Sequence, residues 1–241
     1  MSRLNHLKRS LLAVGVFGIV IIASHSTVKA DPISVCTGAG CSTTNVTGTI
    51  TASNGAVTIT LNNNLTNAQV VSVIQNVSGI YFQVSDYNLG AVFLIGSNSA
   101  QSTNIDGAGA AVLAGNVNPT GWAAGHSGAT ITACVICAFG IGPTAGPEQT
   151  IIGGTGSGTY ASANGSIAGN DPHNPFLAGP VTFTLFVPGV TVNSSFSNVV
   201  VQFGTTATAP DTTVPEPGSM LLLGSGLVGV AASLRKRLGK R

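Results

Sequence analysis

"NVTGTITASNGAVTITLNNN", residues 45–64, is the most informative stretch for the fold class, because it holds two alternating runs of apolar and polar residues with a turn between them. In the second run Val57, Ile59 and Leu61 alternate with threonines. A period of two places the apolar side chains on one face of a half-buried strand. The Asn-Gly step at 54–55 favours a tight hairpin turn, because both residues tolerate positive φ. The stretch therefore predicts an antiparallel hairpin with one face in a core.

Further strand patterns follow along the chain, separated by Gly, Pro and Asn. We expect a strand pair over 68–86 around a turn at 76–79, and single strands over 91–95, 129–141, 181–187 and 197–203. Segments 97–128 and 142–179 are rich in Gly, Asn and Ala, and we expect them to be loops. No sustained helical period occurs. The pattern predicts an all-β domain over residues 31–204, an antiparallel β-sandwich with the jelly roll as one variant.

The N-terminus has the composition of a secretory signal peptide, which we assign to residues 1–30. Arg3, Lys8 and Arg9 precede an uncharged run over 11–23 and a segment that ends with Ala30. Basic residues, a short apolar helix and small residues before the cut are the parts that signal peptidase recognises. We expect cleavage after Ala30.

The C-terminus has a second apolar run, over 218–234, followed by five basic residues. Its length is at the lower limit for one transmembrane helix, and the basic cluster would stay cytoplasmic. A Thr/Pro linker over 205–214 precedes it. With the N-terminus exported, the body would lie outside the inner membrane. A plain tail anchor is the simpler alternative.

Pro215, Glu216 and Pro217 stand directly before this apolar run. The prolines favour an extended segment, which a peptidase can bind as a strand. The triplet, the apolar run and the basic Arg235, Lys236 and Arg237 together resemble the PEP-CTERM sorting signal of Gram-negative bacteria, over residues 215–241. The resemblance implies recognition by a membrane-embedded exosortase, cleavage near the triplet, and transfer from the inner membrane to the cell surface or an extracellular matrix. These residues would be substrate residues, not catalytic ones.

Charge is confined to the ends of the chain. All nine Lys and Arg residues lie in the two terminal signals, so the body from Asp31 to Val214 is acidic. Nucleic-acid binding draws much of its affinity from Lys and Arg, so we exclude that class. The Gly-rich stretch over 151–160 lacks the lysine of a phosphate-binding loop. We expect no cofactor.

The four cysteines form two close pairs, Cys36 with Cys41 and Cys134 with Cys137. In an exported protein disulfides are the default, and four cysteines allow three pairings. We favour the two local ones, because each closes without long-range docking, while a cross-link between the pairs remains the alternative. No basic neighbour is present to activate Cys134 or Cys137 for redox catalysis.

No coherent catalytic site or metal site can be assembled from the sequence. His173 with Asp171 is the strongest pair for a binding role. The simpler interpretation of both His173 and His126 is a turn residue that forms hydrogen bonds within its own loop. The sequence alone does not give the separation of the carboxylates inside the body, and a clustered calcium loop is missing. We therefore predict that the protein is not an enzyme and holds no metal.

Sugar recognition is the second functional hypothesis. Trp122 is the main candidate for stacking on a pyranose, with three tyrosines as further candidates: Tyr81, Tyr87 and Tyr160. Five Asn-x-Ser/Thr triplets make the chain a glycoprotein candidate, and they begin at Asn45, Asn64, Asn76, Asn164 and Asn193.

Three hypotheses follow. The first is a secreted, non-catalytic surface or matrix protein, whose partners are signal peptidase and exosortase. The second is a carbohydrate-binding module that attaches cells to exopolysaccharide. The third is a hydrolase, for which the sequence supplies no site.

Overall fold

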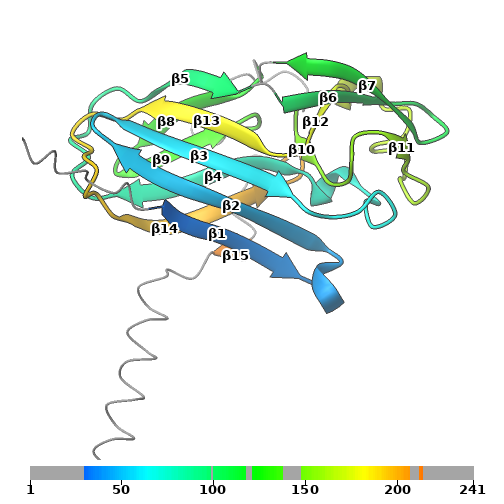
Figure 1. Ribbon diagram of the computed structural model, residues 1–241, viewed down its shortest axis with the longest axis horizontal. Coiled ribbons are helices and arrows are strands. Elements are labelled where there is room, and N and C mark those ends of the chain that lie inside the picture. The colour runs from blue at the N-terminus through cyan, green and yellow to red at the C-terminus, as the bar shows by residue number, and fades with distance from the viewer. Residues whose placement is uncertain (1–29, 99, 118–120, 138–147, 207–211, 214–241) are drawn as a thin grey trace, which may run out of the picture.

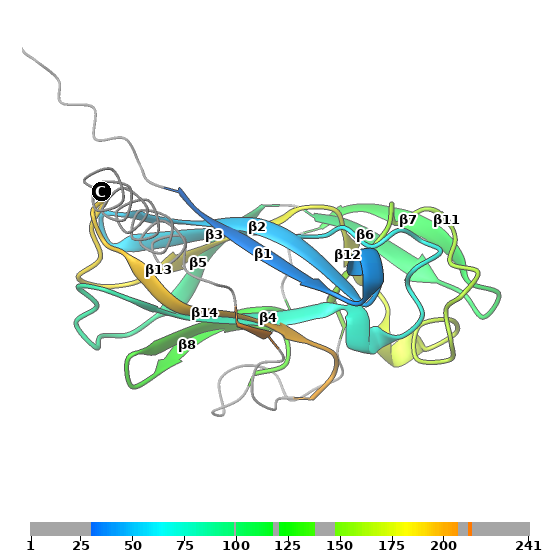
Figure 2. The same cartoon turned by 90° about the horizontal axis from the view of Figure 1, so that it is seen from below.

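The computed structural model describes residues 30–98, 100–117, 121–137, 148–206 and 212–213. They form an all-β fold in which two sheets face each other, as Figure 2 shows edge-on. The only helical segments among them are three single 3-10 turns, at Ala39–Cys41, Val73–Gln75 and Asp171–His173. None of the described helices could span a membrane. The predicted sandwich arrangement is confirmed, and its jelly-roll variant stays a prediction.

The five-stranded sheet contains the predicted hairpin and faces the viewer in Figure 1. Strands β2 (Thr44–Ser53) and β3 (Ala56–Asn63) pair with Ser53 opposite Ala56, so Asn54 and Gly55 alone form the turn. Val57, Ile59 and Leu61 of β3 are fully buried and its threonines are not, as predicted. The strand order is β1-β2-β3-β13-β5, with β1 at Ala30–Thr37, β13 at Val181–Phe186 and β5 at Phe93–Asn98.

The second sheet has ten strands and is centred on β4 (Val77–Val84), which pairs with β14 (Phe196–Phe203) and β9 (Thr130–Cys134). Short strands extend it on either side. They are β6 (Ala100–Ile105), β7 (Ala110–Val117), β8 (Ala123–Ser127), β10 (Ile151–Ile152), β11 (Gly158–Thr159), β12 (Phe176–Ala178) and β15 (Thr212–Thr213).

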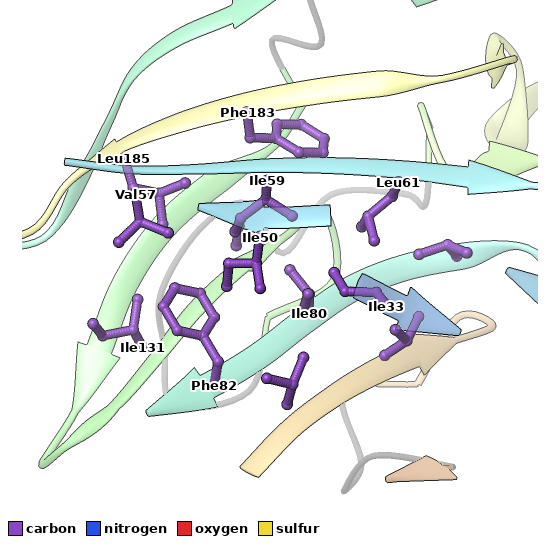
Figure 3. Packing of buried hydrophobic residues seen from close by; sticks show 14 of the residues in the cluster. Ile33, Ile50, Val57, Ile59, Leu61, Ile80, Phe82, Ile131, Phe183 and Leu185 are labelled. Carbon is purple, nitrogen blue, oxygen red and sulfur yellow. The ribbon is translucent and has the colours of Figure 1, made fainter. Parts of the chain in front are cut away.

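The core lies between the two sheets and takes its side chains from both. Ile50, Ile59 and Phe183 point inward from the five-stranded sheet and meet Phe82 and Ile80 of β4 (Figure 3). A second, smaller cluster around Tyr160 and Phe176 fills the end formed by β6, β10 and β12. Burial of these apolar side chains is the main force that holds the two layers together.

The predicted loop over 97–128 was wrong, because β6, β7 and β8 all lie in it. These strands contain mostly Ala, Gly, Ser, Thr and Asn, so they lack the apolar alternation on which the prediction relied. Backbone pairing within the sheet holds them in place. The segment over 142–179 is also not pure loop, since β10 and β12 pair there in parallel.

The predicted strand pair over 68–86 was also wrong, because only β4 forms. The residues before it make a turn and a 3-10 helix, in which the Gln75 side chain accepts hydrogen bonds from the backbone N–H groups of Val71 and Ser72. Strands β13 and β14, predicted over 181–187 and 197–203, do exist. They lie in different sheets, so the connection through Pro188 crosses from one layer to the other.

Both local disulfides are confirmed: Cys36 bonds to Cys41, and Cys134 bonds to Cys137. At the C-terminal end of the domain, Thr212 and Thr213 pair with Val201 and Val200. They lie in the segment expected to be a linker, and they add the edge strand β15 to the second sheet.

Candidate functional site

The outer face of the five-stranded sheet carries a regular array of threonines. We call it the threonine face, and it consists of Thr47, Thr49, Thr51, Thr58, Thr60, Thr182 and Thr184. Strand register aligns them in rows: Thr58 lies between Thr51 and Thr184, and Thr60 lies between Thr49 and Thr182. The array arises because β3 and β13 alternate threonine with a buried apolar residue, and β2 does the same except at Gly48, between Thr47 and Thr49.

The hydroxyl groups of the threonine face are partly ordered by contacts with one another. The Oγ1 atoms of Thr60 and Thr182 lie 2.9 Å apart, across neighbouring strands. At the edge of the array, Thr47 Oγ1 accepts a hydrogen bond of 2.9 Å from Asn64 Nδ2. A hydroxyl offers one donor and two acceptor positions, so these bonds leave capacity for a ligand. Since no outward residue of these three strands is charged, the face is neutral.

Two phenylalanines lie at one end of the threonine face. Phe93 of β5 is opposite Phe186 of β13, and their rings stack with centroids 5.0 Å apart. Phe93 is 48% exposed, which is unusual for so large an apolar side chain. Phe186 is two residues from Thr184 on the same face of β13. The pair therefore forms an apolar platform that continues the hydroxyl array.

A β-bulge explains why Phe93 faces outward. Thr184 pairs with Gly96 while the next residue, Leu185, pairs with Leu94, so Ile95 is an extra residue in β5. Side chains alternate between the faces of a strand, and one inserted residue reverses the alternation beyond it. Without the bulge, Phe93 would point toward the core.

An open hollow of about 630 Å³ lies at the opposite end of the threonine face. Its lining is neutral and rich in amides: Asn62, Asn64, Thr66, Asn67, Thr155 and Pro180. Asn62 Nδ2 donates to Asn64 Oδ1 over 2.6 Å, and Asn64 in turn bonds to Thr47. The hollow and the array are thus joined by one chain of hydrogen bonds.

Trp122, the main predicted sugar-stacking residue, is buried in the core and is only 4% exposed. Its ring lies against Phe183, and its Nε1–H donates to the carbonyl oxygen of Gln149 over 2.8 Å. A ring packed on its face and bonded at its nitrogen offers no surface to a pyranose. This geometry does not support the ligand-binding role predicted for Trp122 and instead places the ring in the core.

The three tyrosines are also poor candidates for sugar stacking. Tyr81 and Tyr160 are buried, and the Tyr81 hydroxyl donates to Gln202 Oε1 over 2.7 Å. The Tyr160 hydroxyl donates to the carbonyl oxygen of Gly153 and accepts from the N–H of Gly156. Burial raises the pKa of Tyr160, and the Gly156 hydrogen bond partly offsets that rise. The partly buried Tyr87 donates to the carbonyl oxygen of Gly90, and burial raises its pKa as well.

The histidines bond within turns. His173 Nδ1 lies 2.6 Å from the carbonyl oxygen of Ser166, so the proton of a neutral ring sits on Nδ1. Asp171 is exposed at the start of the same 3-10 turn. His126 Nδ1 lies 3.3 Å from the carbonyl oxygen of Gly128 in the turn between β8 and β9. Each bond fixes a loop, as expected for a structural histidine.

Two of the body carboxylates, Asp106 and Asp86, are engaged in hydrogen bonds with neighbouring groups. Asp106 accepts hydrogen bonds from the N–H groups of Ala108 and Ala110, which makes it a turn former. Asp86 accepts from the hydroxyls of Ser85 and Ser194. Within the described part of the chain, no three His, Cys, Asp or Glu side chains come close enough together to hold a metal ion.

The Asn-x-Ser/Thr triplets differ in exposure. Asn76 is fully buried, so its triplet is closed to a glycosylating enzyme once the domain has folded. Asn164 and Asn193 are exposed, while Asn45 and Asn64 are partly buried. Glycosylation at the exposed positions stays a prediction.

The predicted sorting residues lie outside the described residues: Pro215, Glu216, Pro217, Arg235, Lys236 and Arg237. Residues 1–29 of the predicted signal peptide lie outside them too. Ala30, the expected last residue of that peptide, is the first residue of β1 and pairs with Thr51.

Sequence reasoning missed the Phe93–Phe186 platform and the alignment of the threonines across strands. The alternation of threonine with apolar residues was visible over 47–51, 58–60 and 182–184 and could have indicated outward hydroxyls. Which strands become neighbours, and where β5 bulges, depends on tertiary pairing.

Among the comparisons with known proteins, a match was found at the C-terminal end of the chain. No curated protein and no solved structure matches the chain. Residues 213–237 match the family model of the PEP-CTERM protein-sorting motif, and all six predicted sorting residues lie within that match. Such a motif implies processing by an exosortase and export to the cell surface. The chain thus carries at its C-terminus the sorting motif of PEP-CTERM proteins.

Proposed function

We propose that this protein is a secreted, non-catalytic component of the cell surface or extracellular matrix. Signal peptidase cuts after Ala30, the apolar run over 218–234 holds the exported chain in the inner membrane as one helix, and an exosortase then cuts near Pro215-Glu216-Pro217. The observation that carries the proposal is the sorting motif at residues 213–237.

Features of the body support an exported, non-enzymatic role. Two disulfides stabilise it, and these form and persist in oxidising compartments. Both histidines of the body are bonded to turn carbonyls rather than to a nucleophile. An array of neutral hydroxyls suits a surface that stays hydrated without charge.

The test is intact mass spectrometry of the protein from the surface and medium of its native host. We expect a chain that begins at Asp31 and ends near Pro217, with the mass of any glycan added. A Glu216→Ala variant should stay at full C-terminal length in the membrane fraction. Asp211→Ala, which removes a carboxylate just outside the matched motif, is the control and should be processed normally. Normal release of the Glu216→Ala variant would show that the apolar run is only an anchor.

Binding of exopolysaccharide is the second candidate function. The observation that favours it is the neutral outer face of the five-stranded sheet, where a row of hydroxyls extends from the Phe93–Phe186 pair to the amide-lined hollow.

A further inference from the structure

We propose that an uncharged polysaccharide chain binds along the outer face of the five-stranded sheet. It lies parallel to β3, from the Phe93–Phe186 platform at one end to the amide-lined hollow at the other. The inference rests on the second candidate function, binding of exopolysaccharide, and is independent of how the protein is sorted.

The chemistry of the face fits a sugar polymer. The C–H face of a pyranose is apolar and packs on an aromatic ring, which removes apolar area from water. Its hydroxyls need donors and acceptors, and Thr49, Thr60 and Thr182 can act as both. Phe93, with nearly half its surface exposed, supplies the ring, and the neighbouring rows supply the hydroxyls.

The length of the face fits a polymer better than a single sugar. From Ala56, beside Phe186, to Asn62, at the hollow, β3 advances about 20 Å at roughly 3.4 Å per residue. That distance accommodates several sugar rings in a row. The hollow, bordered by Asn62, Asn64 and Pro180, can take one end or a side group of the chain.

The absence of charge selects the class of polysaccharide. No outward residue of β2, β3 or β13 carries a charge, and the described body has no Lys or Arg. A uronic-acid or sulfated polymer would find no cation to neutralise it, and the acidic body would repel it. Binding to a neutral polymer should also be insensitive to salt, since screening acts only on charges.

The experiment is affinity electrophoresis of the full-length chain in mild detergent, in native gels that contain glucomannan, dextran or alginate. Cellulose pull-down is run in parallel. We expect retardation or capture by at least one neutral polymer, unchanged by added salt. Any capture by alginate should be lost in salt, because it would come from the basic terminal segments of the full-length chain. Affinity should also rise with oligosaccharide length.

Variants on the face locate the site, with matched controls elsewhere on the surface. Phe93→Ala should weaken binding about tenfold, because it removes the stacking ring, whereas Phe93→Trp should retain binding. Thr49→Lys should weaken it similarly by placing a long charged side chain in the array. Val112→Ala, at an even more exposed apolar residue on β7, and Thr159→Lys, on β11, should bind like the wild type.

Three outcomes would overturn the proposal. They are failure of every neutral polymer to bind, capture only by alginate with loss in salt, and equal binding by the face and control variants. Each variant is first compared with the wild type in its denaturation midpoint, so that misfolding is recognised. These assays use the purified chain, so their result is independent of sorting. The mass-spectrometry experiment on protein from the native host tests sorting alone.

Discussion

The indole of Trp122 lies against the ring of Phe183, with ring centroids 4.3 Å apart. Trp122 directly precedes β8 of the ten-stranded sheet, whereas Phe183 is on β13 of the five-stranded sheet. The contact therefore joins the two layers beneath the threonine face, and it gives Trp122 a structural role.

Trp122→Ala should destabilise the domain by about 3–5 kcal/mol, the usual cost of truncating a large buried aromatic residue. The change leaves a cavity beside Phe183 and removes the donor to the Gln149 carbonyl oxygen. Urea denaturation measures the loss, with the exposed Val112→Ala as the control. A stable Trp122→Ala domain would mean that the ring is not part of the core.

Removing the Cys36–Cys41 bridge should cost about 2 kcal/mol, because a short loop adds little entropy to the unfolded chain when it is freed. The double variant Cys36→Ser/Cys41→Ser should therefore remain folded, held by the core between the sheets. Denaturation midpoints with and without reductant check this, and peptide mapping checks the pairing. A disulfide-linked peptide that joins Cys36 to Cys134 would contradict the local connectivity.

Gly55→Ala should destabilise the domain by about 1–2 kcal/mol, the cost of a left-handed backbone for a residue with a Cβ. Gly55 has φ of 75°, and an added Cβ would meet only Phe186, at 3.9 Å, so the cost lies in the backbone and not in a clash. Gly107→Ala is the matched control, since that turn glycine has no positive φ and open space around it. Its effect should stay within about 0.5 kcal/mol. Equal effects at both positions would refute the hairpin-turn argument.

Alkaline pH should destabilise the domain through Tyr160, whose pKa is raised mainly by burial. The unfolded chain ionises near pH 10 while the folded phenol keeps its proton, so the unfolded state releases protons first. The contribution of this pKa difference to the free energy of unfolding is complete below about pH 10, the pKa of the unfolded chain, and is lost as pH rises through the raised pKa of folded Tyr160.

The Tyr160→Phe variant separates this titration from the hydrogen bonds. At neutral pH it should lose about 1–3 kcal/mol, because the Gly153 carbonyl and the Gly156 N–H lose their partner. Its stability should then fall less steeply in alkali than that of the wild type. Urea titrations over a pH series, with tyrosinate absorbance, measure both effects. An unchanged alkaline slope would place the titration elsewhere, for example at Tyr87.

The strands that could be predicted from the sequence are those whose side chains alternate between the core and the solvent. The hairpin over 45–64 and the strands near 181–187 and 197–203 alternate clearly, so burial alone specifies them. Strands β6 and β7 do not, because Ala, Gly, Ser and Asn bury little apolar area and depend on their neighbours for pairing. Segment 68–76 is apolar enough for a strand, yet its buried Gln75 bonds locally and favours a turn.

The candidate site was less predictable than the fold, because it depends on which strands meet. Phe93 and Phe186 are far apart in sequence and become partners only through the β5–β13 pairing and the bulge at Ile95. Trp122 was predicted to stack on a sugar, whereas its size and apolar character suit the core equally well. The sorting motif was predictable because its recognition depends on local sequence.

Thr213 belongs both to strand β15 and to the matched sorting motif. Only residues 214–217 then separate the sheet edge from the apolar run that begins at Gly218, a reach of at most about 18 Å. If the inner membrane holds that run before processing, as proposed above, the sandwich is confined within a few nanometres of the lipid and the exosortase works in the narrow gap between them. A cut at the triplet would release a particle with almost no C-terminal tail.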